Sequence, residues 1–487
     1  MNYYKDFLSN AEKVTHKLDT FLDDSIHQKA PVLIQQPIEE LIKQMGLAEH
    51  IESGDLSGQS LEHFVDTYLG NCTRLHHPGF LAQQVAATHP TGALGSLIDG
   101  VTNNAMAIYE MGPAASAIEF FMINWLLSKV GWETADAKQQ LDIESSHAGG
   151  TLTHGGSLGN LTALLAARSA NLPDVWDEGV PNNVVVLVPE QSHYSLKRTV
   201  GVLGIGASNC FAIRADSDGR VDPKGLEDQI IELKAEGKFI MAVVANGCGT
   251  AVGLYDPIEA MADVCERYGI WLHLDAAHGG PALLSKKYGH LLNGIERVDS
   301  IVWDAHKMMM TPTLCAAVLV RDHRNLDNAF QTEASYLLHE KEQPGYDFLI
   351  RNLECTKAGI GLRFFMSVAA QGEKNLVKFY EQVTALAQQT ADWIREQADM
   401  SIAVNPQTNI LCFRFGDADQ LQLDIRKEVL AESKFYISTT AYQDKRWLRL
   451  SIMSPNTQWQ HIEELLLDIR RIGGTIAGTI VNTNKQS

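Results

Sequence analysis

Five short apolar runs in the middle of the chain alternate with longer amphipathic segments. These runs are rich in β-branched residues and are apolar at nearly every position, which is typical of strands covered on both faces. Because such strands alternate with helices, they predict a mostly parallel sheet between helical layers. We expect the strands at residues 182–190, 238–247, 269–277, 299–307 and 314–322.

Two of the amphipathic segments show both ends of a helix. Each begins with Asp-Pro and is followed by a glycine where the apolar period stops. Aspartate is a preferred N-cap, proline a preferred first helical residue, and glycine a common residue just past the last turn. We therefore expect Asp222 and Asp256 to be N-caps, and the two helices to end before Gly237 and Gly269.

The pattern changes on either side of this α/β region. The first part of the chain reads as helices, whereas a long helix pattern from about residue 372 is followed by two strands and two more helices. That C-terminal order is typical of a smaller α+β domain. We predict an N-terminal helical segment, a large α/β domain and a small C-terminal α+β domain, over residues 1–85, 86–360 and 361–487 respectively.

Composition narrows the possible partners. The 487 residues are 45% apolar and 20% charged, which is usual for a globular protein with a large core. The net charge of −19 argues against nucleic acid and against an anionic membrane, because both select basic surfaces. Seven scattered cysteines indicate neither a disulfide framework nor a zinc knuckle. With no signal-like or bilayer-long apolar segment, we expect a cytoplasmic protein that binds small molecules.

A first chemically unusual stretch lies at residues 150–168. Gly155, Gly156 and Ser157 directly precede an amphipathic helix, so backbone N–H groups at its positive end could bind a phosphate. A tight turn with Ser157 as an ordinary N-cap explains the same residues equally well. The glycine spacing is not GxGxxG, so a dinucleotide site is not indicated.

A second stretch, HLDAAHGG, follows one of the expected strands. His273 and Asp275 share one face of that strand, and a carboxylate at a buried strand end is costly unless it meets a cation. The small residues that follow, including Ala277, suggest that a flat group lies close to the backbone. A protonated ring nitrogen is therefore the favoured partner of Asp275. A structural aspartate and a metal site with His273 and His278 are the alternatives.

A third stretch, WDAHKMMMTP, ends another expected strand with a histidine and a lysine. Lysine is rarely buried unless it is paired or chemically used, although a surface lysine after a strand is a common arrangement. Together with a phosphate seat and an aspartate about thirty residues upstream, Lys307 becomes a candidate for a Schiff base with a phosphorylated aromatic aldehyde. The three stretches together indicate pyridoxal phosphate.

On the motifs HLDAAHGG and DAHKMM, the chain resembles the group II pyridoxal-phosphate-dependent amino-acid decarboxylases, from about residue 75 to residue 470. This family includes glutamate, aromatic-amino-acid, cysteine-sulfinate and 2,4-diaminobutyrate decarboxylases. The resemblance implies the PLP-dependent transferase fold type I and the α-decarboxylation of an L-amino acid to an amine and CO2. Together with the long apolar face of the N-terminal helical segment, it also implies a homodimer.

The same resemblance implies roles around the cofactor. Lys307 is similar to the lysine that bonds to the cofactor, and His306 to a phosphate contact. Asp275 is similar to the aspartate that keeps the ring nitrogen protonated, a charge that a buried anion is needed to hold. Ala277 and His193 match the residues on the two faces of the ring. The phosphate-binding positions of the family match Gly155, Gly156 and Ser157.

Residues that would meet the substrate are also implied by the resemblance. Arg449 matches an arginine that grips the substrate carboxylate, although a surface-paired strand arginine is an alternative. Tyr346 is the best match to a loop tyrosine that protonates the product, and Tyr336 competes with it. Gln83 falls where aromatic enzymes carry a tyrosine, while residues 101–119 look like diaminobutyrate-type relatives. We expect 2,4-diaminobutyrate or an acidic amino acid (glutamate, aspartate or cysteine sulfinate) as substrate.

The chain departs from the common family pattern at two places. Asn246, Cys248 and Gly249 stand where relatives usually have an Ala-Thr-x-Gly-Thr-Thr run, and Asp304 replaces a frequent asparagine. Neither change removes a reacting group. An aminotransferase, another fold-type-I enzyme, or a regulatory protein that binds the cofactor without turnover are the alternatives to a decarboxylase.

Overall fold

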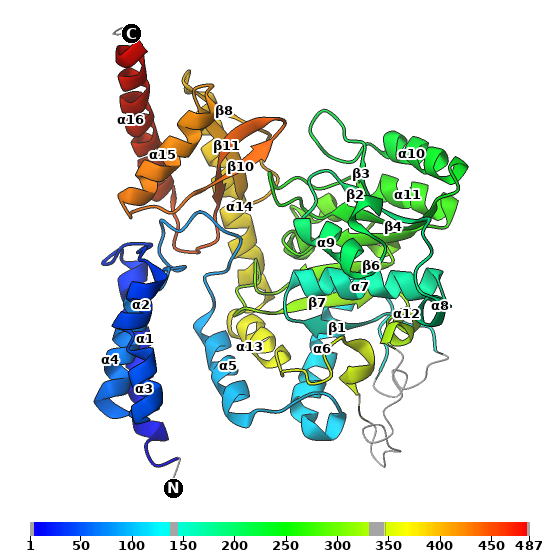
Figure 1. The fold of residues 1–487 in the computed structure, drawn as a ribbon, viewed down its shortest axis with the longest axis horizontal. Helices are drawn as coiled ribbons and strands as arrows, with labels where there is room; N and C mark the ends of the chain where they lie inside the picture. Colours follow the sequence, from blue (N-terminus) through cyan, green and yellow to red (C-terminus); the bar gives the residue numbers. More distant parts are fainter. Residues whose placement is uncertain (1–3, 137–144, 331–344, 346, 485–487) are drawn as a thin grey trace. The chain divides into compact units, whose positions relative to one another are not determined.

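The computed structural model describes residues 4–136, 145–330, 345 and 347–484. The chain divides into two compact units (Figure 1). A small unit is formed by Met1–Ala87, Leu386–Ala403 and Ile410–Ser487, and a large unit by Thr88–Ala385 and Val404–Asn409. The N-terminal helices and the C-terminal α+β segment thus belong to one unit. The three-domain boundaries expected from the sequence stay a prediction.

The large unit is built on a seven-stranded sheet in the order β1-β7-β6-β5-β4-β2-β3. The strands from β6 to β3 pair in parallel, whereas β7 runs antiparallel to both β6 and β1. The mostly parallel sheet predicted from the sequence is therefore confirmed, and each of the five expected strands is present. The strands are β1 (Gly149–Thr153), β2 (Val184–Pro189), β3 (Cys210–Ile213), β4 (Phe239–Asn246), β5 (Trp271–Asp275), β6 (Ser300–Asp304) and β7 (Ala316–Val320).

Helices cover this sheet (Figure 1). Helix α7 packs across β1, β4, β5, β6 and β7, and its buried residues join the central core with β2 and β4. The α-helices of the unit are α5 (Pro90–Thr102), α6 (Pro113–Val130), α7 (Gly156–Asn171), α8 (Val175–Glu178), α9 (Tyr194–Val202), α10 (Pro223–Ala235), α11 (Ile258–Tyr268), α12 (His323–Asp327), α13 (Gly361–Gln371) and the first part of α14 (Glu373–Arg395). Its 3-10 helices are η1 (Tyr109–Met111), η3 (Ala207–Asn209), η4 (Gly280–Leu284), η5 (Gly289–Leu292), η6 (Ile295–Arg297), η7 (Asn328–Phe330) and η8 (Phe348–Arg351).

The two helix starts predicted from Asp-Pro differ. Asp222 caps α10 and accepts a hydrogen bond from the backbone N–H of Lys224 at 3.1 Å, as expected. Asp256 does not cap α11, whose N-cap is Pro257. The Asp256 carboxylate instead accepts from the backbone N–H groups of Val221 (2.9 Å) and Asn246 (2.7 Å), and burial raises its pKa to about 6. This aspartate therefore ties two loops together.

The small unit combines N-terminal helices with a four-stranded antiparallel sheet in the order β10-β11-β9-β8. Helix α15 packs on β11 and on α16, which closes this part of the core. The elements are α1 (Phe7–Ile26), α2 (Ile38–Gln44), α3 (Leu47–Ser53), α4 (Gly58–Gly70), the rest of α14, β8 (Met400–Ile402), β9 (Ile410–Phe415), α15 (Asp419–Ala431), β10 (Ser438–Tyr442), β11 (Lys445–Ser451) and α16 (Trp459–Asn484).

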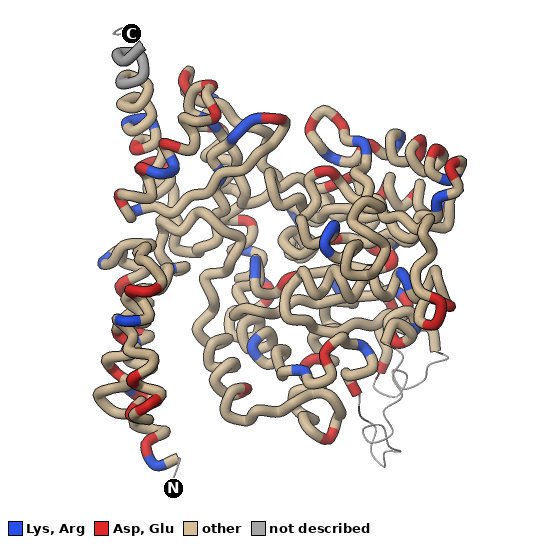
Figure 2. Tube along the Cα trace, in the orientation of Figure 1, with Lys and Arg blue, Asp and Glu red and all other residues tan. Residues whose placement is uncertain are grey.

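Charged residues are distributed over both units. Figure 2 shows lysines and arginines interspersed with the more numerous aspartates and glutamates along the trace. Within the described part of the chain, no helix combines the length and the apolar character needed to cross a membrane.

Candidate active site

A cavity of about 360 Å³ lies in the large unit, at the carboxyl ends of β5 and β6 and the N-terminus of α7. Ligands of open α/β sheets collect at this edge, because the loops that leave the strands meet there. Eight residues were predicted from the sequence to surround a pyridoxal phosphate cofactor, and all eight line this cavity. They are Gly155, Gly156, Ser157, His193, Asp275, Ala277, His306 and Lys307.

The N-terminus of α7 borders the cavity directly after β1. Gly155 is the N-cap residue, with φ at 97°, and Gly156 is the first helical residue, so Ser157 is not the N-cap. A Cβ on Gly156 would lie 2.8 Å from Asp304 Oδ1, so any larger residue here would have to displace the Asp304 side chain. Since the first N–H groups of a helix have no partner within the helix, they are available to an anion in the cavity.

Asp275 ends β5 and is 8% exposed. Its Oδ2 accepts from Asn160 Nδ2 at 3.0 Å and its Oδ1 accepts from the backbone N–H of Ala277 at 3.2 Å. The residues that a metal site would have recruited are used elsewhere. His273 contacts Ser300, and His278 Nε2 lies 2.8 Å from Asn409 Oδ1. Among the described residues, no group of three or more His, Cys, Asp or Glu is arranged to hold a metal ion.

Lys307 lines the cavity at the end of the loop that follows β6, and its side chain is 19% exposed. Its Nζ lies 3.2 Å from Asp304 Oδ2, and His306 Nε2 lies 3.5 Å from the same oxygen. The other Asp304 oxygen is buried and has no hydrogen-bond partner in the described structure. Lys307 is thus a partly buried, paired ammonium inside a cavity, not a surface lysine.

His193 approaches the cavity from α9. It is the N-cap of this helix, and its Nδ1 accepts from the backbone N–H of Ser195 at 3.3 Å and lies 2.7 Å from Ser195 Oγ. Burial lowers the pKa of His193, with a smaller opposing effect of the Asp275 charge. The ring is therefore held by its Nδ1 edge and favours the neutral form.

Three predicted substrate residues belong to the small unit or fall outside the described structure. Gln83 is exposed and belongs to the small unit, as does Arg449. Arg449 is only 6% exposed and its Nη1 donates to the carbonyl of Ala82 at 3.1 Å, so it is not the surface-paired arginine of the alternative interpretation. Tyr346 and its competitor Tyr336 lie outside the described residues.

Sequence reasoning missed several residues of the cavity. Asn160 follows Ser157 by three positions on α7, and this spacing places both side chains on one face of the helix. That signal was available from the pattern. Local sequence carries no comparable signal for the other missed lining residues, which are His154, Tyr194, Thr250 and Leu314. Asn246 and Cys248, noted as departures from the family pattern, also line the cavity.

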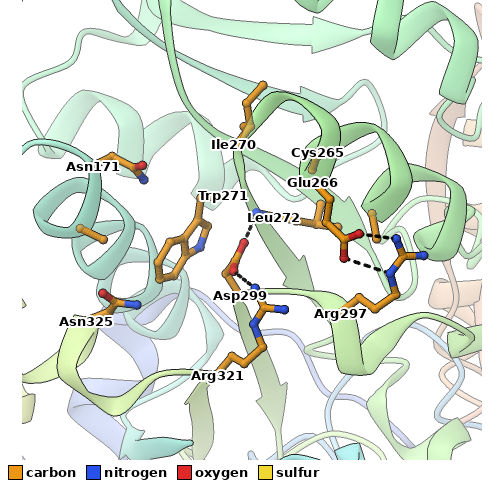
Figure 3. A pocket seen from close by; sticks show the side chains of 13 residues that line it. Asn171, Cys265, Glu266, Ile270, Trp271, Leu272, Arg297, Asp299, Arg321 and Asn325 are labelled. Atoms are coloured by element: carbon orange, nitrogen blue, oxygen red, sulfur yellow. Dashed lines mark hydrogen bonds and ion pairs between the residues drawn. The ribbon is translucent and has the colours of Figure 1, made fainter. Parts of the chain in front are cut away.

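A second cavity of about 330 Å³ lies at the opposite, amino ends of β5 and β6 (Figure 3). Its charged side chains pair with each other. Arg297 contacts Glu266 at 2.6 Å, and Arg321 contacts Asp299 at 2.5 Å. Asp299 also accepts from the backbone N–H of Leu272. The charged side chains that Figure 3 labels in this cavity are thus paired with each other, and we do not propose this cavity as the active site.

Comparison with known proteins agrees with the chemistry of the first cavity. Residues 51–416 match the family model of the pyridoxal-dependent decarboxylase conserved domain. The chain is 26% identical to acidic amino acid decarboxylase GADL1 of Mus musculus over 90% of this chain and 81% of that protein. It is also 26% identical to L-2,4-diaminobutyrate decarboxylase of Acinetobacter baumannii, over 88% of this chain and 86% of that protein.

The fold has a close match among solved structures. The crystal structure of mouse CSAD superimposes with a TM-score of 0.85 at 25% identity, covering 96% of this chain and 98% of that one. This match extends over both units, and the family model covers the sheet, the α7 N-terminus and the lysine loop. The chain therefore belongs to the pyridoxal-dependent decarboxylase family, and it is a pyridoxal-phosphate-dependent amino-acid decarboxylase.

Proposed function

We propose that this decarboxylase converts an L-amino acid with a small polar side chain, either 2,4-diaminobutyrate or an acidic amino acid, to the corresponding amine and CO2. The observation that carries the proposal is the meeting of Lys307, Asp275 and the N-terminus of α7 at one cavity. Two relatives act on substrates of these two kinds, an acidic amino acid decarboxylase and a diaminobutyrate decarboxylase. Gln83, at a position where aromatic enzymes carry tyrosine, supports a non-aromatic substrate.

The cavity fits pyridoxal phosphate part by part. A lysine amine suits its aldehyde, a buried carboxylate suits its ring nitrogen, and a helix N-terminus with two glycines suits its phosphate. When bound, the cofactor supplies an electron sink for the pair left on Cα as CO2 departs. We assign the bond to the cofactor to Lys307, the ring nitrogen to Asp275, and the phosphate to Gly155, Gly156, Ser157 and His306.

The protein's own residues then have defined tasks. Asp275 presents a carboxylate, fixed through both oxygens, that keeps the ring nitrogen protonated. Ala277 leaves room on one ring face, and His193 covers the other with a neutral ring whose Nδ1 edge is held. Asp304 holds the Lys307 ammonium at the cavity until the cofactor enters.

Substrate contacts are proposed from the resemblance and from the small unit. Arg449 grips the α-carboxylate, and its hydrogen bond to the carbonyl of Ala82, the neighbour of Gln83, supports a shared role for these two residues. Tyr346 delivers the proton that completes the amine. An arginine held by backbone contacts suits carboxylate recognition, since its planar fork can bind both oxygens.

We propose that the protein acts as a cytoplasmic homodimer. Several large apolar side chains are exposed on α5 of the large unit, including Leu94 at 50% and Val101 at 60%, and on α1 of the small unit, including Leu8 at 70%. Such faces are unusual for a monomer and suit a second copy of the chain. Sedimentation should give a dimer across a wide range of concentrations, and a fully active monomer would refute this assembly.

The activity is tested by incubating the purified protein and pyridoxal phosphate with a panel of L-amino acids. CO2 release is measured and the amine is identified by mass spectrometry, with Lys307→Ala as the inactive control. A keto acid and the amine form of the cofactor would identify an aminotransferase instead. A yellow protein that releases no CO2 from any substrate would indicate a protein that only binds the cofactor.

The assignment of Lys307 is tested separately by borohydride reduction of the loaded protein and peptide mapping. We expect the pyridoxyl label on Lys307, which lines the cavity. A label on Lys286 or Lys287 would overturn the assignment.

A further inference from the structure

A chain of buried hydrogen bonds leads from the amino ends of β5 and β6 to the cavity. Trp271 Nε1 donates to Ser300 Oγ at 2.9 Å, and Ser300 Oγ lies 2.9 Å from His273 Nδ1. His273 Nε2 lies 3.0 Å from Asn160 Oδ1. Trp271 is 7% exposed, and the other three residues of this chain are at most 2% exposed, so water does not compete for these bonds.

The direction of these bonds follows from the donors and acceptors available. The Asp275 carboxylate can only accept, so the Asn160 amide turns its nitrogen to Asp275 and its oxygen to His273 Nε2. Ser300 Oγ accepts from the Trp271 indole N–H and donates its own hydrogen to His273 Nδ1. Burial lowers the pKa of His273 to about 4, which makes the ring neutral at physiological pH. With Nδ1 accepting, the ring proton is on Nε2 and is donated to Asn160 Oδ1.

The chain of hydrogen bonds divides into two branches at Asn160. With its oxygen used by His273, its amide nitrogen donates one hydrogen to Asp275 Oδ2 at 3.0 Å and the other to Ser195 Oγ at 3.2 Å. Because His193 Nδ1 already accepts from the backbone N–H of Ser195, the Ser195 hydroxyl donates to the same atom at 2.7 Å, and the His193 proton is on Nε2. A reversed amide would place its oxygen against the Asp275 carboxylate, two acceptors at hydrogen-bond distance, so only this direction satisfies every group.

We propose that Asn160 is a positioning residue that aims Asp275 at the cofactor ring nitrogen and orients the Ser195 hydroxyl toward His193. The inference rests on the roles proposed above for these two residues. Asn160 acts through them: its amide is 2% exposed and both of its hydrogens are used. It joins Asp275, which would bind the ring nitrogen, to the Ser195–His193 pair in one buried arrangement.

The test compares two variants of Asn160 without any substrate. Asn160→Asp keeps the shape but places a second carboxylate against Asp275 and removes both donated hydrogens, whereas Asn160→Ala removes the group. We expect the dissociation constant of pyridoxal phosphate to rise about tenfold in Asn160→Ala and about a hundredfold in Asn160→Asp. The visible circular dichroism per bound cofactor, which depends on a fixed ring angle, should fall in the same order.

Asn171→Asp is the matched control, since Asn171 ends the same helix and its Nδ2 donates only to the carbonyls of Ala167 and Met241. It should leave both readouts at the wild-type level. A purely steric role for Asn160 predicts the reverse order, with the isosteric Asn160→Asp close to wild type and Asn160→Ala the weaker binder. That order, or wild-type binding by both variants, would overturn the proposal.

A gentler variant keeps the inference testable if Asn160→Asp does not fold. Ser195→Ala cuts only the branch to His193 and leaves the Asn160 contact with Asp275. The visible circular dichroism should fall while the melting temperature of the apo protein stays within the range of Asn171→Asp, and an unchanged spectrum would overturn this branch. Because substrate is absent, these results stand apart from the proposed reaction, which fails only if no amino acid yields an amine.

Discussion

Replacing Lys357 should show how strongly β1 depends on a buried ion pair. Lys357 and Glu119 are both completely buried, and Lys357 Nζ donates to Glu119 Oε1 and to Thr151 Oγ1, the latter at 2.8 Å. Glu119 Oε1 also accepts from the backbone N–H of Leu152 at 2.8 Å. The pair thus ties α6 and the segment before α13 to β1, the strand that leads into the glycines of the cavity.

The magnitude follows from what each change leaves behind. Lys357→Met fills a similar volume, so the main loss is the cation, and the Glu119 carboxylate stays buried without its counter-charge. Stranding a charge in this way costs about 3–5 kcal/mol. Glu119→Gln should cost less, because burial already lowers the pKa of Lys357 and the amine can lose its proton when the carboxylate is gone. The double variant strands no charge and should lie within about 2 kcal/mol of wild type.

Urea unfolding followed by tryptophan fluorescence measures these differences, since α6 carries Trp125 and Trp132 follows it closely. Lys129→Met is the matched control. It breaks the exposed pair with Glu373, at 2.7 Å, and should cost less than about 1 kcal/mol. The reasoning is refuted if Lys357→Met loses no more than this control, or if adding Glu119→Gln to it restores no stability.

Three further predictions concern the site and the pH dependence of stability. Asp275→Asn should lower kcat at least a hundredfold with little change in apo stability, because a shift of two units in the ring-nitrogen pKa is worth about 2.7 kcal/mol; near-normal turnover would make Asp275 structural. Gly156→Ala should weaken pyridoxal phosphate binding about tenfold by pushing Asp304 aside, and unchanged affinity in a titration would contradict this. Burial lowers the pKa of His77 and of His273 from 6.5 to about 4, so the stability these neutral rings carry is complete above pH 6.5 and lost as pH falls toward 4. Each histidine should lower the free energy of unfolding by about 2 kcal/mol at pH 5. A urea midpoint that is no lower at pH 5 than at pH 8 would contradict this.

The strands that the sequence predicted are those whose pattern is local. β2, β4, β5, β6 and β7 are buried at nearly every position, and a continuous β-branched run reports such burial directly. β1 and β3 were missed because their sequences contain no continuous β-branched run. β1 reads Gly-Gly-Thr-Leu-Thr and is a strand through its pairing with β7, while β3 is a half-exposed edge strand of four residues.

Capping illustrates a limit of the same kind. Asp222 and Asp256 each form an Asp-Pro pair at the start of a helix, yet only Asp222 caps its helix. The carboxylate of Asp256 is taken by two backbone N–H groups, one of them 35 positions earlier in the chain. A tertiary contact overrode the local preference, and no pattern near Asp256 announces that contact.

The candidate site also has parts that local sequence predicts and parts that depend on tertiary contacts. Asp275 and Lys307 could be placed together from the sequence because Asp275 ends one parallel strand and Lys307 closely follows the next, and carboxyl ends of parallel strands share an edge. The strand order makes β5 and β6 neighbours, which brings their carboxyl ends next to each other. The surroundings of Arg449 depend instead on a fold in which residues far apart in sequence, Ala82 and Arg449, meet.

The hydrogen-bond chain through Asn160 is the part of the site that only coordinates could reveal. Its links join residues 113 and 115 positions apart, and its direction depends on one carboxylate, Asp275, that can only accept. A sequence pattern reports burial, but it does not report which of two ring nitrogens carries a proton. The Asp275 carboxylate orients the Asn160 amide, and the amide oxygen then requires the His273 proton on Nε2. An acceptor at the cavity therefore fixes the tautomer of a histidine that is buried within the sheet.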